Sequence, residues 1–331
     1  FIALTNVKNP ALSELIIEKL FENLQKGLDK GDIMIPKTLL MVFGELMNLG
    51  ILNSFNFINL LLEIVNEAEN TLSVSRDYYL HIAISVLPYV VEGLMKKSQI
   101  EYKNLIRLIK TLMAKRNLAY ISITRPFKDS KPTDRLSEYW GAILEYIESE
   151  NRGEIRSIPR PYQHFADELS GVTQVKKTTS TKLYFNNKVV ENCVYQSPYR
   201  FQIFDEKILE EEVKSKLDLL ILRETASDLL FLFQHNKSLA LQTLFTLCTD
   251  YSCPSLITDA VISETFRLPN SDCRTIFYSS VLIGLGTDAN LNATIKQAAG
   301  LLFDNVEKLD IELVDRFSSW LSHYMANFKY E

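Results

Sequence analysis

The chain has 331 residues, of which 47% are hydrophobic, and it carries a formal net charge of -5 at pH 7. This length and composition are sufficient for one or two domains with buried cores. The net acidity argues against a protein that binds phosphate backbones regardless of sequence. No apolar run reaches the roughly 18–20 residues that a membrane span requires, so we expect no membrane partner.

The first part of the chain predicts an array of helices, because apolar residues recur at i, i+3 and i+4. Five helices are expected, at 11–28, 36–49, 55–68, 77–97 and 99–116. Pro88 falls inside the fourth and is expected to end or kink it. Helix pairs near 11–49 and 55–97 recur at roughly 40 residues, the period of HEAT-like repeats. Such repeats stack on one another and leave long exposed faces for partners.

Residues 123–203 differ in character and are interpreted as an irregular connector. The stretch ITRPFKDSKPTDR contains two prolines and no helical stripe, and one short helix follows at 136–148. A small hairpin is expected about Asn186-Asn187. Residues 172–182 are basic and rich in threonine and serine, so we expect them to be mobile.

Helices resume at about residue 204, and LPNSD at 268–272 marks a turn between two of them. The expected domains are a helical-repeat domain at 1–122, incomplete at its N-terminus, the connector at 123–203 and a second helical-repeat domain at 204–331. The chain starts inside an apolar segment without a methionine and ends abruptly. These two features suggest an excerpt of a longer chain.

The sequence carries no motif for catalysis or metal binding. GxGxxG, P-loop, GxSxG and kinase motifs are missing, so we do not expect an enzyme. None of the four cysteines stands in a CxxC pair and the four histidines lie far apart. We therefore expect no zinc and no cofactor. Free thiols such as Cys248 and Cys273, in apolar surroundings, fit a cytosolic or nuclear compartment.

A basic stripe lies on the helix expected at 99–116. Lys103, Arg107 and Lys110 share one helix face because they are spaced i, i+4, i+7. Two interpretations are open. The stripe is either a solvated face close to the helix C-terminus or a patch that steers RNA or an acidic partner.

Residues 314–331, VDRFSSWLSHYMANFKYE, predict a helix rich in aromatic residues. An apolar seam at 3–4 spacing is expected: it consists of Val314, Phe317, Leu321, Tyr324 and Phe328. Trp320 and Tyr330 fall at the edge of this seam, and His323 lies on the same turn as Trp320. These three residues are candidates for binding a partner, because rim aromatics are favoured at interfaces. The alternative is that the two aromatics close the domain core or pack on a missing third domain.

Four stretches resemble the large-subunit family of the nuclear cap-binding complex. They are ELVDRFSSWLSHYMANFKYE, the preceding TDAVISETFRLPNSDCRTIFYSSVLIGL, IPRPYQHFADEL in the connector and RDYYLHIAISVLPYVVEGL upstream. The resemblance runs from about residue 10 to the C-terminus and is most specific in the last third. Residues 171–203 depart from the family's form.

The resemblance implies an all-α scaffold of HEAT-like repeats, related to the middle domain of the translation initiation scaffold. It also implies a nuclear protein, shuttling to the cytoplasm, that forms a heterodimer with a small subunit of RNA-recognition fold. That small subunit holds the 7-methylguanosine cap, so the large subunit contacts capped RNA indirectly. The large subunit recruits factors for splicing, export, 3′-end processing and nonsense-mediated decay. The alternative is a helical-repeat nuclear transport receptor or another interaction scaffold, although the long connector is unusual for a transport receptor.

Overall fold

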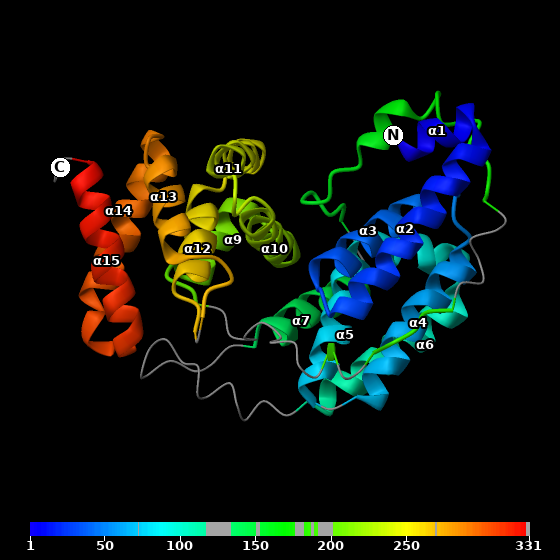
Figure 1. Ribbon diagram of the computed structural model, residues 1–331, viewed down its shortest axis with the longest axis horizontal. Coiled ribbons are helices and arrows are strands. Elements are labelled where there is room, and N and C mark those ends of the chain that lie inside the picture. Colours follow the sequence, from blue (N-terminus) through cyan, green and yellow to red (C-terminus); the bar gives the residue numbers. More distant parts are fainter. Residues whose placement is uncertain are drawn as a thin grey trace. The chain divides into compact units, whose positions relative to one another are not determined.

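The computed structural model describes residues 1–71, 73–116, 134–149, 153–175, 182–186, 189–190, 201–268 and 270–328. Every helix or strand assigned within these ranges is a helix (Figure 1). The expected all-α fold is therefore confirmed. The chain divides into two compact units. Unit 1 comprises Phe1–Asn117, Ile143–Arg152 and Ile158–Gln196, and unit 2 comprises Leu118–Ala142, Gly153–Ser157 and Ser197–Glu331.

Unit 1 begins with successive helices whose ends follow local sequence signals. Asn9 caps the second helix through a hydrogen bond from the Leu12 amide (3.1 Å), and Gly31 ends it in the left-handed region at φ 66°. Helix α2 packs on α3, both α3 and α4 pack on α5, and α6 packs on α4. The helices are α1 (Ile2–Lys8), α2 (Pro10–Lys30), α3 (Met34–Asn48), α4 (Ser54–Asn70), α5 (Ser73–Lys97) and α6 (Gln99–Ala114).

Helix α5 is the core helix of unit 1. It continues through Pro88 to Lys97 instead of ending there. Among the described residues, its Ser75–Lys97 part is the one stretch long and apolar enough to cross a membrane, so the expectation that no such run exists is wrong. In the structure 78% of its most apolar window is buried. This burial is typical of the central helix of a globular domain, packed on all sides by its neighbours.

Described parts of the expected connector are attached to unit 1 by specific hydrogen bonds. The Val175 amide donates to the Ile51 carbonyl at 2.9 Å. The Thr173 amide donates to the Asn6 side chain at 2.8 Å, and the Tyr184 amide donates to Gln25 Oε1 at 3.0 Å. These bonds hold the residues on either side of 176–181 against unit 1. Residues 176–181, part of the segment expected to be mobile, lie outside the described residues.

The short helix of the connector is present as α7 (Arg135–Glu148), and a 3₁₀ helix, η2, covers Pro161–Phe165. The expected hairpin is not formed by the residues that are described. The amides of Val189 and Val190 donate to the Asn186 carbonyl at 3.0 and 3.3 Å, as in a helical turn. Asn187 itself lies outside the described residues.

Unit 2 stacks its helices in two layers, as helical repeats do. Each helix from α10 to α13 contacts the second α-helix after it: α10 packs on α12 and α12 on α14, while α11 packs on α13 and α13 on α15 (Figure 1). The elements are α9 (Glu206–Val213), α10 (Lys216–Leu232), α11 (Lys237–Tyr251), α12 (Pro254–Thr265), α13 (Thr275–Leu285), α14 (Ala289–Asp304), η3 (Val306–Lys308) and α15 (Ile311–Asn327).

Helix α12 is the centre of this stack, and every residue from Ser255 to Thr265 is buried. Its Asp259 is fully buried and forms an ion pair with Arg223 of α10. Asp259 Oδ1 also accepts hydrogen bonds from the amides of Ile203 (2.8 Å) and Phe204 (3.2 Å). One carboxylate therefore links the segment before α9 to two core helices.

Candidate functional site

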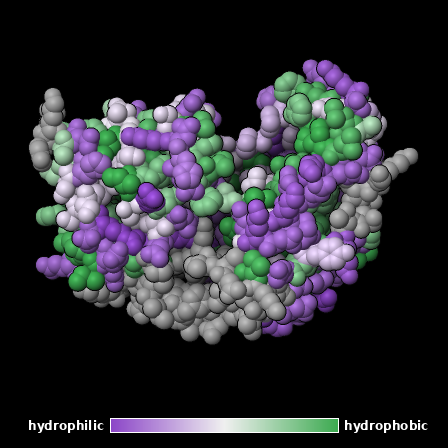
Figure 2. Space-filling view, in the orientation of Figure 1, coloured by the Kyte–Doolittle hydropathy of each residue, from purple (hydrophilic) through white to green (hydrophobic). Residues whose placement is uncertain are grey.

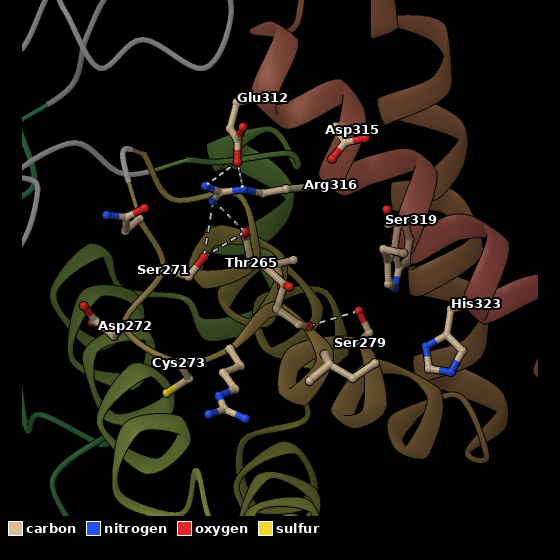
Figure 3. Close-up of a pocket in the computed structure, with 15 residues that line it drawn as sticks. Thr265, Ser271, Asp272, Cys273, Ser279, Glu312, Asp315, Arg316, Ser319 and His323 are labelled. Carbon is tan, nitrogen blue, oxygen red and sulfur yellow. Dashed lines mark hydrogen bonds and ion pairs between the residues drawn. The ribbon is translucent and has the colours of Figure 1, made fainter.

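A polar cavity of about 650 Å³ opens in unit 2 between α15 and the loop that joins α12 to α13 (Figure 3). It is large enough for a small ligand or a few residues of a peptide. Most of its wall is hydroxyl-bearing or charged. The lining residues are Thr265, Asn270, Ser271, Asp272, Cys273, Arg274, Thr275, Ile276, Ser279, Glu312, Asp315, Arg316, Ser319, Trp320 and His323.

Arg316 of α15 holds the loop in place (Figure 3). Its guanidinium donates to the Arg267 carbonyl at 2.8 Å and to the Thr265 carbonyl at 3.4 Å. Ser271 Oγ donates to the same Thr265 carbonyl at 3.1 Å. Glu312, one turn earlier, fixes the guanidinium through an ion pair at 3.0 Å. Helix α15, which begins some forty residues later, thus holds the turn expected at LPNSD through hydrogen bonds from Arg316.

An ionic cluster around the buried Arg267 joins the end of α12 to the loop. Arg267 Nη1 contacts Glu264 at 3.1 Å and Asp272 at 2.6 Å. Ser227 of α10 donates to Glu264 at 2.8 Å. Burial raises the pKa of the Asp272 carboxyl, while Arg267 opposes the rise and Glu264 adds to it. Arg267 therefore pairs with both carboxylates, and Asp272 is exposed and also lines the cavity.

Trp320 lies in the core and not at the rim, so its expected placement as a rim aromatic is wrong. The side chain is 1% exposed and packs against Phe317 and Tyr324, with ring centroids 5.9 and 5.8 Å apart. The buried seam of α15 is Leu313, Phe317, Trp320 and Tyr324, and Leu321 is only half-buried. The seam is rotated by about one residue from the expected one.

Trp320 nevertheless also lines the cavity, and its indole Nε1 is buried without a hydrogen-bond partner among the described residues. His323, half-buried one turn further on, lines the same cavity. Tyr330, the third partner-binding candidate, lies outside the described residues. The structure thus brings two of the three candidates to one hollow, while their role in binding a partner stays a prediction.

The basic stripe is on a different part of the chain, in unit 1. Lys103, Arg107 and Lys110 are exposed on one face of α6. Lys110 lies 3.8 Å from Glu148, with both side chains more than half exposed. Solvent-exposed pairs of this kind contribute little to stability. The contact favours a solvated face with local charge balance, and contact with RNA stays a prediction.

A second hollow, of about 590 Å³, lies in unit 1 and is apolar. Its wall includes Ile2, Met41, Pro161 and Phe165 among other apolar side chains. Figure 2 shows hydrophobic residues gathered on the surface near α1, where Phe1 and Leu4 are exposed. Tyr162 also lines the hollow, and burial together with a hydrogen bond to Glu45 raises its pKa to about 12.

The three cysteines of unit 2 lie in environments that disfavour the thiolate form. Burial raises the pKa of Cys253 to about 12, and it also raises the pKa values of Cys248 and Cys273. Thiolates are the reactive form, so these environments suppress nucleophilic chemistry. Within the described ranges no three His, Cys, Asp or Glu side chains are grouped so that they could hold a metal ion.

Sequence reasoning missed the residues that shape the cavity, above all Arg316 and Arg274. Glu312 and Arg316 at i, i+4 are a visible sign of a local ion pair. The carbonyls that Arg316 binds are far away in the sequence, so no spacing rule could connect them.

The fold and the cavity define a class of protein: an α-helical repeat protein with a hollow at a loop between two of its helices. Residues 248–331, which contain α12 to α15, match the family described as MIF4G like. The cavity therefore lies in the part of the chain that is similar to this family, and the expected likeness to this fold is confirmed.

The particular proteins that the chain resembles share one name, nuclear cap-binding protein subunit 1. This chain is 24% identical to the Xenopus tropicalis protein over 277 residues. The aligned stretch covers 80% of this chain and 34% of the relative. The chain is 21% identical over 342 residues to subunit 1-A of Xenopus laevis, covering 99% and 43%. It is 20% identical over 358 residues to the Arabidopsis thaliana protein, covering 99% and 42%. The resemblance found in the sequence motifs is thus confirmed by homologues in animals and a plant.

The chain spans about a third to two fifths of the length of these curated relatives.

Proposed function

We propose that this chain is part of the large, scaffolding subunit of a nuclear cap-binding complex. The observation that carries the proposal is the shared name of its relatives, whose similarity extends over 80–99% of the chain. The helical-repeat architecture supports it, because stacked helices offer extended faces to partners. The chain acts in the nucleus and shuttles to the cytoplasm with its RNA.

In this proposal the chain does not hold the cap itself. A small subunit of RNA-recognition fold forms a heterodimer with it and stacks the 7-methylguanosine between aromatic side chains. Recognition of single-stranded nucleic acid uses a basic groove with aromatic platforms, whereas this chain has a net charge of -5. The heterodimer then recruits factors for splicing, export and decay, and the chain has no enzymatic role.

The test is retention on a resin that carries 7-methylguanosine. The chain is applied alone, together with the purified small subunit, and together with the small subunit plus free cap analogue as competitor. We expect the resin to retain the chain only when the small subunit is present and no competitor is added. Free cap analogue should release the bound chain, and unmethylated GTP should not. Retention of the chain alone at nanomolar affinity, or failure to co-elute with the small subunit, would overturn the proposal.

A further inference from the structure

We propose that the polar cavity in unit 2 binds a short peptide segment of a protein partner, with an Asp or Glu side chain of that segment seated beside Trp320 and the N-terminal end of α13. The proposal depends on groups in the cavity and not on cap binding. It therefore goes beyond the function proposed above and can fail or succeed separately from it.

The first observation is the unpaired indole of Trp320. The side chain is 1% exposed, it lines the cavity, and its Nε1–H has no acceptor among the described residues. Buried polar groups in native proteins are paired with few exceptions, and each exception requires an explanation. An acceptor oxygen supplied by a ligand satisfies this donor.

The second observation is the N-terminal end of α13. Arg274 is the N-cap residue, and no side chain there accepts a hydrogen bond from the first-turn amides. Arg274, Thr275 and Ile276 all line the cavity and are exposed. The first amides of a helix carry partial positive charge and bind anions. Together with Arg274, which lines the same cavity, they form its donor-rich side.

The charges on the opposite wall decide which kind of anion fits. Glu312 is committed to Arg316 at 3.0 Å and Asp272 to Arg267 at 2.6 Å. Asp315 of α15 is exposed, lines the cavity and has no ion pair with a described residue. Figure 3 shows Asp315 on α15, the helix that also carries Ser319 and His323.

A peptide is favoured over RNA by this balance. An RNA strand would bring several phosphates close to three carboxylates, of which Asp315 has no balancing partner in the cavity wall, and like charges repel. A peptide can place one carboxylate against the α13 end and a neighbouring lysine or arginine against Asp315. The cavity of about 650 Å³ accommodates a few residues in an extended form.

The test uses soluble octapeptides in matched pairs, in which each Asp-containing member has an otherwise identical Asn counterpart. Half of the pairs carry a lysine next to the variable position, and a uridine octamer is the RNA probe. Binding to the whole chain, without any small subunit or cap, is measured by fluorescence anisotropy. We expect Asp members with an adjacent lysine to bind at least tenfold more tightly than their Asn counterparts.

The best peptide is then added to nitrogen-15-labelled chain. The chain contains two tryptophans, so the indole region of the spectrum contains two resonances, and Trp140 serves as an internal control. We expect the Trp320 Nε1–H resonance to move and that of Trp140 to stay. Trp320→Phe, which keeps an aromatic ring and removes the N–H, assigns the resonance and should lose at least fivefold in affinity.

Arg274→Gln is the second variant, because an exposed side chain can be replaced without unfolding the domain. It should weaken peptide binding at least tenfold, and Lys296→Gln, at an exposed position of α14 that does not line the cavity, is the matched control with no effect. Equal binding of Asp and Asn members, an unmoved Trp320 resonance, full affinity of Arg274→Gln, or tighter binding of the uridine octamer than of any peptide would each overturn the proposal.

Discussion

Replacing Asp259 by leucine removes the carboxylate that links three segments of unit 2. The side chain is fully buried, it pairs with Arg223, and it accepts hydrogen bonds from the amides of Ile203 and Phe204. Breaking a buried ion pair from one side costs about 3–5 kcal/mol, because the remaining charge is left without compensation. Two backbone donors also lose their acceptor, at about 1–3 kcal/mol for each one that water does not reach. We therefore expect Asp259→Leu to lower the free energy of unfolding by about 4 kcal/mol or more.

The double variant Asp259→Leu, Arg223→Met separates the two contributions. Replacing both members of a buried pair by apolar residues is often neutral, so the charge part of the loss should be recovered. The two amides remain without an acceptor, so a loss of about 1–3 kcal/mol should persist. A coupling free energy of about 2 kcal/mol between the two positions is then expected.

Urea unfolding followed by tryptophan fluorescence measures these quantities. Both tryptophans, Trp140 and Trp320, belong to unit 2, so the signal follows this unit. The m-value of the variants should match that of the parent chain, as it must for a comparison of stability alone. A loss below about 1 kcal/mol for Asp259→Leu, or strict additivity in the double variant, would refute the reasoning.

Three further predictions concern the buried face of α15 and the raised pKa values of Tyr162 and Cys253. Phe317→Ala should lower the free energy of unfolding by about 3–5 kcal/mol in the same urea experiment. Leu321→Ala, which truncates a half-buried side chain, should lower it by about 1 kcal/mol. Equal losses would contradict the observed orientation of α15. The phenol of Tyr162 has a folded pKa of about 12 against an ordinary value of 10.0, so its contribution to stability is present below pH 10 and lost as the pH rises from 10 to 12. Tyr162→Phe should therefore show a shallower alkaline loss of unfolding free energy, and an identical slope would refute the shift. Cys253, with its pKa raised to about 12, should react with iodoacetamide at neutral pH far more slowly in the native chain than in urea; peptide mass analysis showing equal rates would contradict its burial.

The helices were predictable because their signals are local. Apolar spacing, Asn9 before Pro10 and Gly31 after the helix define α2 within a few residues of sequence. The fold class followed from the repetition of such segments. The phase of α15 was not predictable in the same way, because Trp320 and Leu321 are both apolar and adjacent. Contacts with Phe317 and with the rest of unit 2 decide which of the two faces the core.

The candidate site was only partly predictable. Trp320 and His323 were singled out by their positions on the expected helix, and both line the cavity. Arg316 and Arg274 became visible only when α15 and the loop before α13 were placed together, because the hydrogen bond from Arg316 to the Arg267 carbonyl joins residues about fifty positions apart. Local rules of spacing and capping carry no information on such pairs.

The two units are interleaved along the chain, and this limits how unit 2 can be transferred between genes. The stability of this unit draws on residues well before its main segment at Ser197–Glu331. Arg135 pairs with Glu224, and Ser157 donates to Asp218 through its amide (2.8 Å) and its hydroxyl (2.6 Å). A recombination event that transferred only the later helices to another gene would leave both partners behind and expose buried carboxylates. Unit 2 is therefore expected to move between genes only as the continuous stretch from residue 118 to residue 331, which includes the unit 1 residues at 143–152 and 158–196.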